Sequence, residues 1–373
     1  MKNLCWMLLG ASLLTACSPA AKMEISGTLN GIESDTLLVC HWAVEGGETQ
    51  FDTVAMHNGQ FAFNVGDTVL KQVNIYAKPS GNGALSMKAM GLVLLPGRPV
   101  TINGTLDDYR LGGDAYYEAC NEMNELLRPC MEQLDSLRKV CMQMEVDGVS
   151  ADSIRRVNAC SQELLNRMQD LRCDFIRCHA DQNVAVDVLS DLPVEKIGEM
   201  LDVVAEPVRT GVMAPLYRQV KDGYDKEMAR RAAAGRMKEG NAAPDFTLKD
   251  LKGNDFTLSS LRGKYVVLDF WGSWCGWCIK GVPDMKKAYA KHKAKVEFVG
   301  IDCRDTEEKW RKAVEEHDML WLHVRNEGDP DVSVLYAVRG YPTKIVISPE
   351  GLILKVVVGE DPEFYTYLDG LLK

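Results

Sequence analysis

The chain has 373 residues, of which 46% are hydrophobic, and a formal net charge of −10 at pH 7. This length and composition predict two or three globular domains with enough apolar residues for their cores. The negative balance argues against nucleic-acid binding, which needs clustered Lys and Arg. Beyond the N-terminal segment, the sequence has no run of 18 apolar residues that predicts a membrane span.

The N-terminus has the features of an export signal. A short basic start precedes an apolar run from Leu4 to Thr15, which is too short to cross a membrane. Leu14-Thr15-Ala16-Cys17 resembles the processing box of lipoproteins, in which the cysteine becomes the lipidated first residue. We therefore predict a signal peptide over 1–16, a lipid anchor on Cys17 and a tether over 17–22. An ordinary secretory signal is the alternative.

Residues 23–114 have the pattern of short β-strands. Phe61 to Val65 alternates large with small or polar residues, and Val73 to Ala77 is rich in strand-forming types. Turn-forming pairs separate such segments, and this spacing predicts a small β-sandwich domain. Its histidines, His41 and His57, are isolated and indicate no catalytic cluster. We interpret this β-domain as a spacer or a recognition module.

Residues 115–238 have the pattern of helices. Apolar residues recur every three or four positions from Ala119 to Cys141, and again from about Asp152 to His179. Gly148 interrupts the pattern, and the short connection predicts an antiparallel helical hairpin. A third helical unit begins near Pro193.

Six cysteines lie in this predicted hairpin. Folding the hairpin at Gly148 brings Cys141 near Cys160 and Cys120 near Cys178, and both pairs could form structural disulfides in an exported protein. The alternative is that these cysteines are buried free thiols that pack as small apolar side chains.

A Cys-x-x-Cys motif follows the most apolar segment of the C-terminal part. A buried-strand pattern from Val266 to Phe270 leads into a turn that carries Cys275 and Cys278, and a helix is predicted to begin there. A thiol at a helix N-terminus has a lowered pKa, because unpaired N–H groups and the helix dipole stabilise the thiolate. The spacing therefore predicts a redox-active pair. A zinc site, which would need further ligands, and a static disulfide are the alternatives.

Four features around this motif occur in a specific order. Trp274 precedes the first cysteine, Asp269 lies six residues before it, Pro283 follows the second cysteine by five residues, and Gly340-Tyr341-Pro342-Thr343 comes later. This arrangement resembles the thioredoxin superfamily, specifically the thiol–disulfide oxidoreductases tethered in bacterial cell envelopes. The resemblance covers residues 240–373 and implies an α/β thioredoxin fold, a mixed sheet flanked by helices.

The flanking segments fit the same resemblance. The stretch from Ala243 to Lys264 resembles the entry hairpin of envelope thioredoxin-like proteins and peroxiredoxins. A strand over Val296–Asp302, a helix over Glu307–His317, a strand hairpin about Pro349-Glu350-Gly351 and a closing helix are expected to follow. Phe51–Phe63 and Leu95–Ile102 resemble a β-domain of unknown function that often precedes thioredoxin-like domains.

The resemblance implies roles for the site residues. Cys275 is expected to be the exposed nucleophile and Cys278 the resolving thiol, with Asp269 as a buried general base of raised pKa. The lysine that often accompanies this acid in thioredoxins is absent from the strand Val296–Ile301. Cys303 is expected to pack in the core, although a third redox thiol is an alternative.

Substrate contacts are also implied. The peptide bond before Pro342 is expected to be cis and to present the Tyr341 backbone to an extended substrate segment. Trp274 and Trp277, with Trp271, are expected to form an apolar rim against a partner protein. The resemblance implies neither a cofactor nor a metal.

The expected partners are disulfide-containing proteins of the cell envelope and an upstream thiol reductant of the inner membrane. The residue after Cys17 is Ser18 rather than Asp, which by resemblance to lipoprotein sorting permits an outer-membrane location facing the periplasm.

Three functions compete. The first is a membrane-tethered thiol–disulfide oxidoreductase that reduces envelope proteins. The second is a thiol peroxidase, but a peroxiredoxin needs a Pro-x-x-x-Thr-x-x-Cys loop, which the segment Phe270–Cys275 lacks. The third is a non-catalytic tethered adaptor that binds partners through the β-domain.

Overall fold

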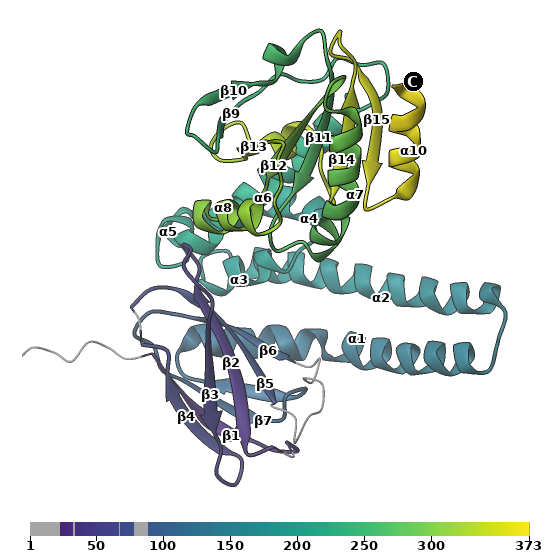
Figure 1. Cartoon of the computed structure of the whole chain (residues 1–373). Coiled ribbons are helices and arrows are strands. Elements are labelled where there is room, and N and C mark those ends of the chain that lie inside the picture. Colours follow the sequence, from purple (N-terminus) through teal and green to yellow (C-terminus); the bar gives the residue numbers. More distant parts are fainter. Residues whose placement is uncertain (1–22, 33, 67, 78–88, 373) are drawn as a thin grey trace, which may run out of the picture. The chain divides into compact units, whose positions relative to one another are not determined.

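The structure is a computed structural model that describes residues 23–32, 34–66, 68–77 and 89–372 (Figure 1). The predicted signal peptide (1–16), the tether (17–22) and the lipidation site Cys17 therefore lie outside the described residues. The chain divides into two units between Asp222 and Gly223. Each unit is described by itself.

The first part of the N-terminal unit is a β-sandwich, as predicted. One four-stranded sheet has the order β4-β1-β7-β8 and the other has the order β3-β2-β5-β6. In β5, Val73 and Ile75 are buried while Gln72 and Asn74 on the opposite face are half-buried, which is the alternation expected of a strand with one face in the core. The strands are β1 (Glu24–Leu29), β2 (Thr36–Ala43), β3 (Gln50–Ala55), β4 (Gln60–Asn64), β5 (Lys71–Ala77), β6 (Ala89–Leu94), β7 (Val100–Gly104) and β8 (Tyr109–Gly112).

The helical hairpin follows, also as predicted. It consists of α1 (Ala115–Val146) and α2 (Ala151–Cys178). The side chains of Asp114 and Ser150 cap the two N-termini, and Gly148 adopts a positive φ of 66° in the connection. Four shorter or later helices complete the region: α3 (Val184–Ser190), α4 (Val194–Met200), α5 (Glu206–Thr210) and α6 (Ala214–Ala234).

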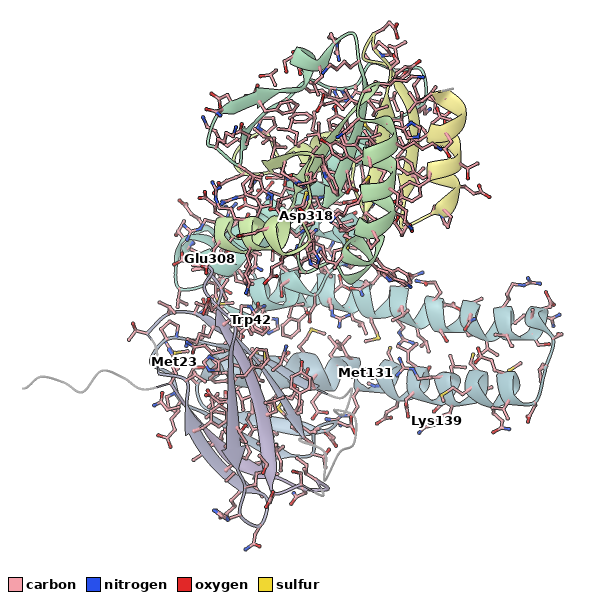
Figure 2. The ribbon with its side chains drawn as sticks, in the orientation of Figure 1. Met23, Trp42, Met131, Lys139, Glu308 and Asp318 are labelled. Carbon is pink, nitrogen blue, oxygen red and sulfur yellow. A yellow bond between two sulfur atoms is a disulfide. The ribbon has the colours of Figure 1, made fainter. Side chains whose placement is uncertain are left out.

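Burial is concentrated at one end of this hairpin. The buried residues of α1 end at Cys130, and those of α2 begin at Met168. The outer part, where Figure 2 labels Met131 and Lys139, is exposed, and Met131 keeps 51% of its surface accessible. The base of the hairpin therefore supplies the packing of this unit.

Of the two alternatives for the hairpin cysteines, the structure has free thiols and not disulfides. All the described cysteines other than Cys275 and Cys278 are free thiols, and Cys141 makes a hydrogen bond to Asn158 rather than a bond to Cys160. Neither Cys141 and Cys160 nor Cys120 and Cys178 are therefore joined by a disulfide bond. The alternative of buried thiols holds for Cys130 and Cys173 but not for Cys160 and Cys178, which are exposed.

The C-terminal unit has the predicted thioredoxin fold. Its seven-stranded mixed sheet has the order β10-β9-β13-β12-β11-β14-β15, in which β11, β12 and β13 are parallel and β14 is antiparallel to β11. The strands are β9 (Thr247–Asp250), β10 (Asp255–Thr257), β11 (Tyr265–Trp271), β12 (Val296–Asp302), β13 (Leu322–Arg325), β14 (Thr343–Ile347) and β15 (Ile353–Val358).

Apolar clusters cover both faces of this sheet. One contains Val267 of β11 together with residues of three helices, α7 (Gly276–His292), α8 (Glu307–Glu316) and α10 (Pro362–Leu371). The other contains Leu268 and Phe270 of β11 with residues of the entry hairpin. The two clusters bury the sheet on both sides, which explains the continuous apolar pattern of β11. The sequence interpretation missed β13 and the short helix α9 (Val332–Leu335).

The helix α6 ends at Ala234, before the predicted limit between the helical and thioredoxin-like regions, and the division between the two units falls inside that helix. The predicted domain limits at 114/115 and at 238/240 stay predictions. Within the described part of the chain, no helix is both long and apolar enough to span a membrane.

Candidate active site

Cys275 and Cys278 form a disulfide at the start of α7. Cys275 is the N-cap residue, and its Sγ accepts a hydrogen bond of 3.1 Å from the backbone N–H of Cys278. The sulfur therefore lies where unpaired N–H groups and the helix dipole stabilise negative charge. Both cysteines are only 7% exposed and belong to the apolar cluster around Trp271. The expectation that Cys275 is exposed is wrong for this disulfide form, because neighbouring side chains cover it.

Asp269 lies on β11 below the disulfide. Its side chain is 14% exposed, and its Oδ1 has no hydrogen-bond partner among the described residues. Burial raises the pKa of Asp269, and the negative charge of Glu360 adds to that effect, whereas the positive charge of Lys344 opposes it. A carboxyl of raised pKa near a thiol can exchange a proton with it.

The lysine that the sequence interpretation did not find comes from β14. Lys344 is directly opposite Asp269 in the antiparallel register, and its Nζ lies 3.9 Å from Asp269 Oδ1. It also lies 2.6 Å from Glu360 Oε2, and the hydroxyl of Tyr365 donates to the other oxygen of Glu360 at 2.7 Å. Lys344 and Glu360 were not predicted, although a lysine inside the apolar run of β14 was a usable signal.

These groups meet at a narrow cavity beneath the second cysteine. The cavity has a volume of about 10 Å³, at the lower limit for one water molecule. Asp269, Cys278, Lys344 and Glu360 line it, together with Gly281, which has no side chain to fill the space. The arrangement places a buried carboxyl and an ion pair beside the same sulfur.

The predicted cis peptide bond between Tyr341 and Pro342 is present. The Tyr341 ring lies edge-on to Trp274, with 5.2 Å between centroids, and the Trp274 indole donates to the backbone oxygen of Cys303 at 2.9 Å. The Arg304 guanidinium lies 5.5 Å from the Trp274 ring and 5.3 Å from the Tyr341 ring. Arg304 is therefore a neighbour of the site that the sequence interpretation missed.

The predicted tryptophan rim is correct in part. Trp274 is 48% exposed and Trp277 is 63% exposed, whereas Trp271 is 1% exposed and packs edge-on against His323. Trp271 is thus a core residue, because it is the last residue of β11 and faces the cluster beneath α7. Cys303 is also buried, and burial raises its pKa to about 12, which fits the expected packing role.

Among the residues that the structure describes, no cluster of three or more His, Cys, Asp and Glu side chains could hold a metal ion.

Comparison with known proteins gives consistent matches to the C-terminal unit. Residues 240–356 match the AhpC/TSA family. The chain is 33% identical to the thiol-disulfide oxidoreductase ResA of Bacillus cereus (strain ZK / E33L) over 139 residues, which are 37% of this chain and 79% of the relative. It is 34% identical to ResA of Bacillus subtilis (strain 168) over 153 residues, which are 41% of this chain and 84% of the relative.

Solved structures are similar over the same region. The thioredoxin domain of a thiol-disulfide oxidoreductase from Bacteroides vulgatus is 34% identical, with a TM-score of 0.35, and the match covers 36% of this chain and 99% of that domain. A putative thiol:disulfide interchange protein DsbE from Chlorobium tepidum is 30% identical, with a TM-score of 0.33, and the match covers 36% and 94% of the two chains. With relatives matched over most of their own length, this chain belongs, through its C-terminal unit, to the family of thioredoxin-like thiol-disulfide oxidoreductases.

Proposed function

We propose that the protein is a membrane-tethered oxidoreductase that reduces disulfides of cell-envelope proteins by dithiol exchange at Cys275 and Cys278. The observation that supports this most directly is the disulfide at the N-terminus of α7 with Asp269 buried beneath it. A helix N-terminus favours a thiolate, and a neighbouring thiol three residues away can close the ring again.

The proposed reaction has two exchange steps. In the reduced enzyme, the Cys275 thiolate attacks one sulfur of a substrate disulfide, forms a mixed disulfide and releases the other substrate sulfur as a thiolate that takes up a proton. The Cys278 thiolate then attacks Cys275 Sγ, forms the Cys275–Cys278 bond and releases the second substrate thiol. Two electrons pass from the enzyme dithiol to the substrate, and an upstream dithiol reduces the enzyme again.

Asp269 would serve the second step. Cys278 must lose its proton before it attacks, and both Cys278 and Asp269 line the small cavity beneath the disulfide. A carboxylate of raised pKa accepts that proton more readily than an ordinary one. Lys344 limits the rise in pKa, since its positive charge favours the ionised form of Asp269.

Trp274, Trp277 and the Tyr341-Pro342 loop would bind the substrate chain. The two exposed indoles flank the first cysteine, and exposed aromatic side chains are enriched at protein interfaces. The Tyr341 ring lies edge-on to the Trp274 ring, so the loop before Pro342 adjoins the exposed indole. An extended segment of the substrate could then bind along the Tyr341 backbone next to the reactive sulfur.

The proposed location is the outer membrane, with the protein facing the periplasm through a lipid on Cys17. The export signal and the processing box in the sequence support this proposal. The reductant would then be a thiol protein that receives electrons at the inner membrane. Mass spectrometry of the purified protein's N-terminal peptide tests the anchor: an acylated Cys17 supports it, and an unmodified N-terminus contradicts it.

Insulin reduction with dithiothreitol as the electron source tests the activity. We expect the wild-type chain to accelerate reduction and Cys275→Ser to abolish the acceleration, whereas Cys160→Ser, in an exposed free thiol of α2, should retain it. In envelope extracts, Cys278→Ala should accumulate mixed disulfides through Cys275. An inactive wild-type chain that instead consumes hydrogen peroxide would favour a peroxidase, and inactivity in both assays would favour an adaptor.

A further inference from the structure

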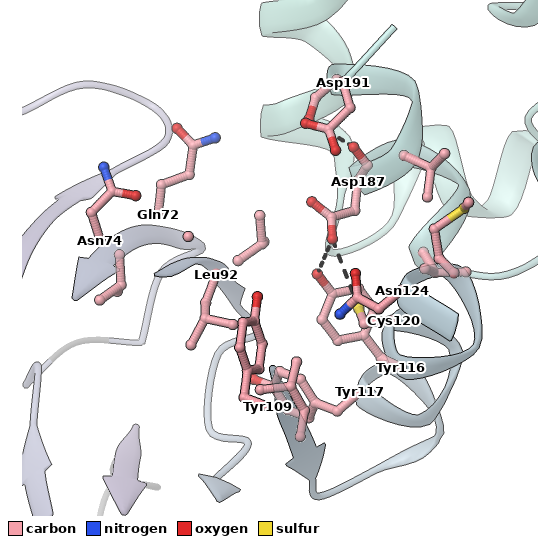
Figure 3. A pocket seen from close by; sticks show the side chains of 18 of the residues that line it. Gln72, Asn74, Leu92, Tyr109, Tyr116, Tyr117, Cys120, Asn124, Asp187 and Asp191 are labelled. Carbon is pink, nitrogen blue, oxygen red and sulfur yellow. Dashed lines mark hydrogen bonds between the residues drawn. The ribbon is translucent and has the colours of Figure 1, made fainter. Parts of the chain in front are cut away.

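The N-terminal unit contains a cavity that the disulfide chemistry does not use. Its volume is about 410 Å³, which is within the range of small-molecule sites. One wall comes from β2, β5 and β6 of the sandwich, and the other comes from α1 and α3, with β8 contributing at the base. Figure 3 shows Gln72 and Asn74 on the sheet side and Asp187 and Asp191 on the helix side.

The sheet wall offers carboxamides beside apolar and aromatic surface. Trp42 donates its indole N–H to Gln72 Oε1 at 3.0 Å, which fixes the Gln72 amide and leaves its NH₂ group for another partner. Asn74 and, on the helix side, Asn124 make no side-chain hydrogen bond within the described residues. Leu92 of β6 also lines this wall. The wall can therefore contact an apolar body and satisfy polar groups at its edge.

The helix wall carries the charge. Asp187 Oδ2 accepts a hydrogen bond of 2.9 Å from the Tyr116 hydroxyl and a longer one of 3.8 Å from Cys120 Sγ, while its Oδ1 has no partner among the described residues (Figure 3). Asp191 also lines the cavity. The residue is exposed, and its pKa is raised by partial desolvation of the carboxyl, which the charge of Arg172 opposes from outside the lining.

No positive side chain balances these carboxylates inside the cavity. The described lining residues include Asp187 and Asp191 but no Lys, Arg or His. Burial raises the pKa of Asp187 to about 6, so the group is ionised at pH 7.5 although the residue is only half-exposed. An ionised carboxylate in such a place is costly unless a positive partner or further hydrogen bonds compensate it.

Tyr117 also lines the cavity and is fully buried, but its hydroxyl meets the backbone of Leu95, which is not a lining residue. The polar groups that the cavity offers are therefore the carboxamides of Gln72, Asn74 and Asn124 and the carboxylates of Asp187 and Asp191. The lining thus combines hydrogen-bonding groups with a net negative charge.

We propose that this cavity binds a small organic cation, a primary ammonium group on an aromatic or aliphatic body. The ammonium donates to the free Oδ1 of Asp187 and lies within the field of Asp191. The body of the ligand packs between Leu92 and the ring of Tyr109, and the amides of Gln72 and Asn74 hydrogen-bond to its polar substituents. The complementarity of charge gives preference over neutral or anionic molecules of the same shape.

Isothermal titration of the purified full chain at pH 7.5 tests this proposal. The probes are tryptamine, tyramine and spermidine as ammonium compounds, with tryptophol and indole-3-acetate as the neutral and anionic counterparts of tryptamine. We expect one-to-one binding of at least one ammonium probe with a Kd below 1 mM. If tryptamine binds, tryptophol should bind at least 10-fold more weakly than tryptamine. Indole-3-acetate should not bind.

Two variants locate the binding. Asp187→Asn removes the charge but keeps an oxygen for the Tyr116 hydroxyl, and it should weaken ammonium binding at least 10-fold. Gly91→Val adds bulk to a lining position where a Cβ atom would have Asn74 Oδ1, at 3.3 Å, as its only contact within 4 Å. It should weaken binding without altering either carboxylate. Asp181→Asn, at an exposed residue outside the lining, is the matched control and should bind as the wild type does.

The outcomes decide the proposal. Circular dichroism checks that each variant is folded, and Gly91→Val keeps the test valid if Asp187→Asn does not fold. The proposal is overturned if none of the three ammonium probes binds below 1 mM. It is also overturned if tryptamine and tryptophol bind equally, or if a probe binds the folded variants as tightly as the wild type.

Discussion

The carboxylate of Glu360 occupies the space that a side chain on residue 281 would need. A Cβ atom added to Gly281 in α7 would lie 2.4 Å from Glu360 Oε2 and 2.5 Å from its Cδ. Glu360 cannot turn away freely, because it is bound to Lys344 at 2.6 Å and to the Tyr365 hydroxyl at 2.7 Å. We therefore expect Gly281→Ala to displace the carboxylate and break its pair with a lysine side chain that is only 4% exposed.

The size of the effect follows from opposing contributions. Losing one partner of a buried ion pair costs about 3–5 kcal/mol. Replacing glycine by alanine inside a helix returns about 1 kcal/mol. Asp269, whose Oδ1 lies 3.9 Å from Lys344 Nζ, still offers this lysine a carboxylate and keeps the loss toward the lower end. The expected result is a decrease of about 2 to 4 kcal/mol in the unfolding free energy of the C-terminal unit.

Urea unfolding followed by tryptophan fluorescence measures this decrease in the oxidised full chain. Among the described tryptophans only Trp42 belongs to the N-terminal unit, so the signal reports mainly on the C-terminal one. Gly370→Ala in α10 is the matched control, since a Cβ atom there would have no neighbour within 4 Å and should leave stability unchanged or raise it by up to about 1 kcal/mol. A Gly281→Ala protein as stable as the wild type would refute the reasoning.

Three further predictions concern the site and the cysteines. Because burial raises the pKa of Asp269, the folded state holds this proton more tightly than the unfolded state, and stability falls as pH rises from the ordinary carboxyl range through the raised pKa. Asp269→Asn should therefore be more stable than the wild type at pH 8 but not at pH 4. The same variant should reduce insulin about 10²- to 10⁴-fold more slowly. A variant with wild-type activity and unchanged stability would contradict both roles of Asp269. Trp277→Ala should raise KM for insulin by about 3- to 10-fold, because a 63% exposed indole contributes contact area. Turnover of the small substrate hydroxyethyl disulfide should stay unchanged. An equal loss with both substrates would argue against a contact role of Trp277. In the native protein without reductant, iodoacetamide should label the exposed Cys160 and Cys178 but not Cys303, which is buried and has a pKa raised to about 12. Peptide mass spectrometry reads the labelling. A labelled Cys303, or an unlabelled Cys160 and Cys178, would contradict the structure.

Local signals in the sequence were enough for much of the fold. The apolar run of β11, the cysteine pair at a helix start and the periodic pattern on either side of Gly148 predicted elements that the structure contains. Each of these signals depends on neighbouring residues in the chain, such as a turn or a repeat of three to four positions. The thioredoxin fold and the cis bond before Pro342 were likewise accessible, because an ordered set of short motifs specifies them.

The side chains that surround the disulfide could not be predicted from local sequence patterns. The resemblance predicts a lysine near Asp269 on the neighbouring parallel strand, but the antiparallel register of β14 places Lys344 opposite Asp269. Glu360 reaches the same place from beyond β15. Trp271 and Trp274 have the same spacing as Trp274 and Trp277, yet Trp271 ends a buried strand while the other two are exposed.

What the sequence by itself determined is therefore the position of the cysteine pair and the elements that carry it, because both are encoded over a few residues. Only the tertiary structure decided which side chains surround that disulfide, which hairpin cysteines remain free, and that Asp187 lines a cavity with the amides of β5. These outcomes depend on sheet register and on helix packing between distant segments. Such contacts are set by the burial of whole surfaces, which no local pattern specifies.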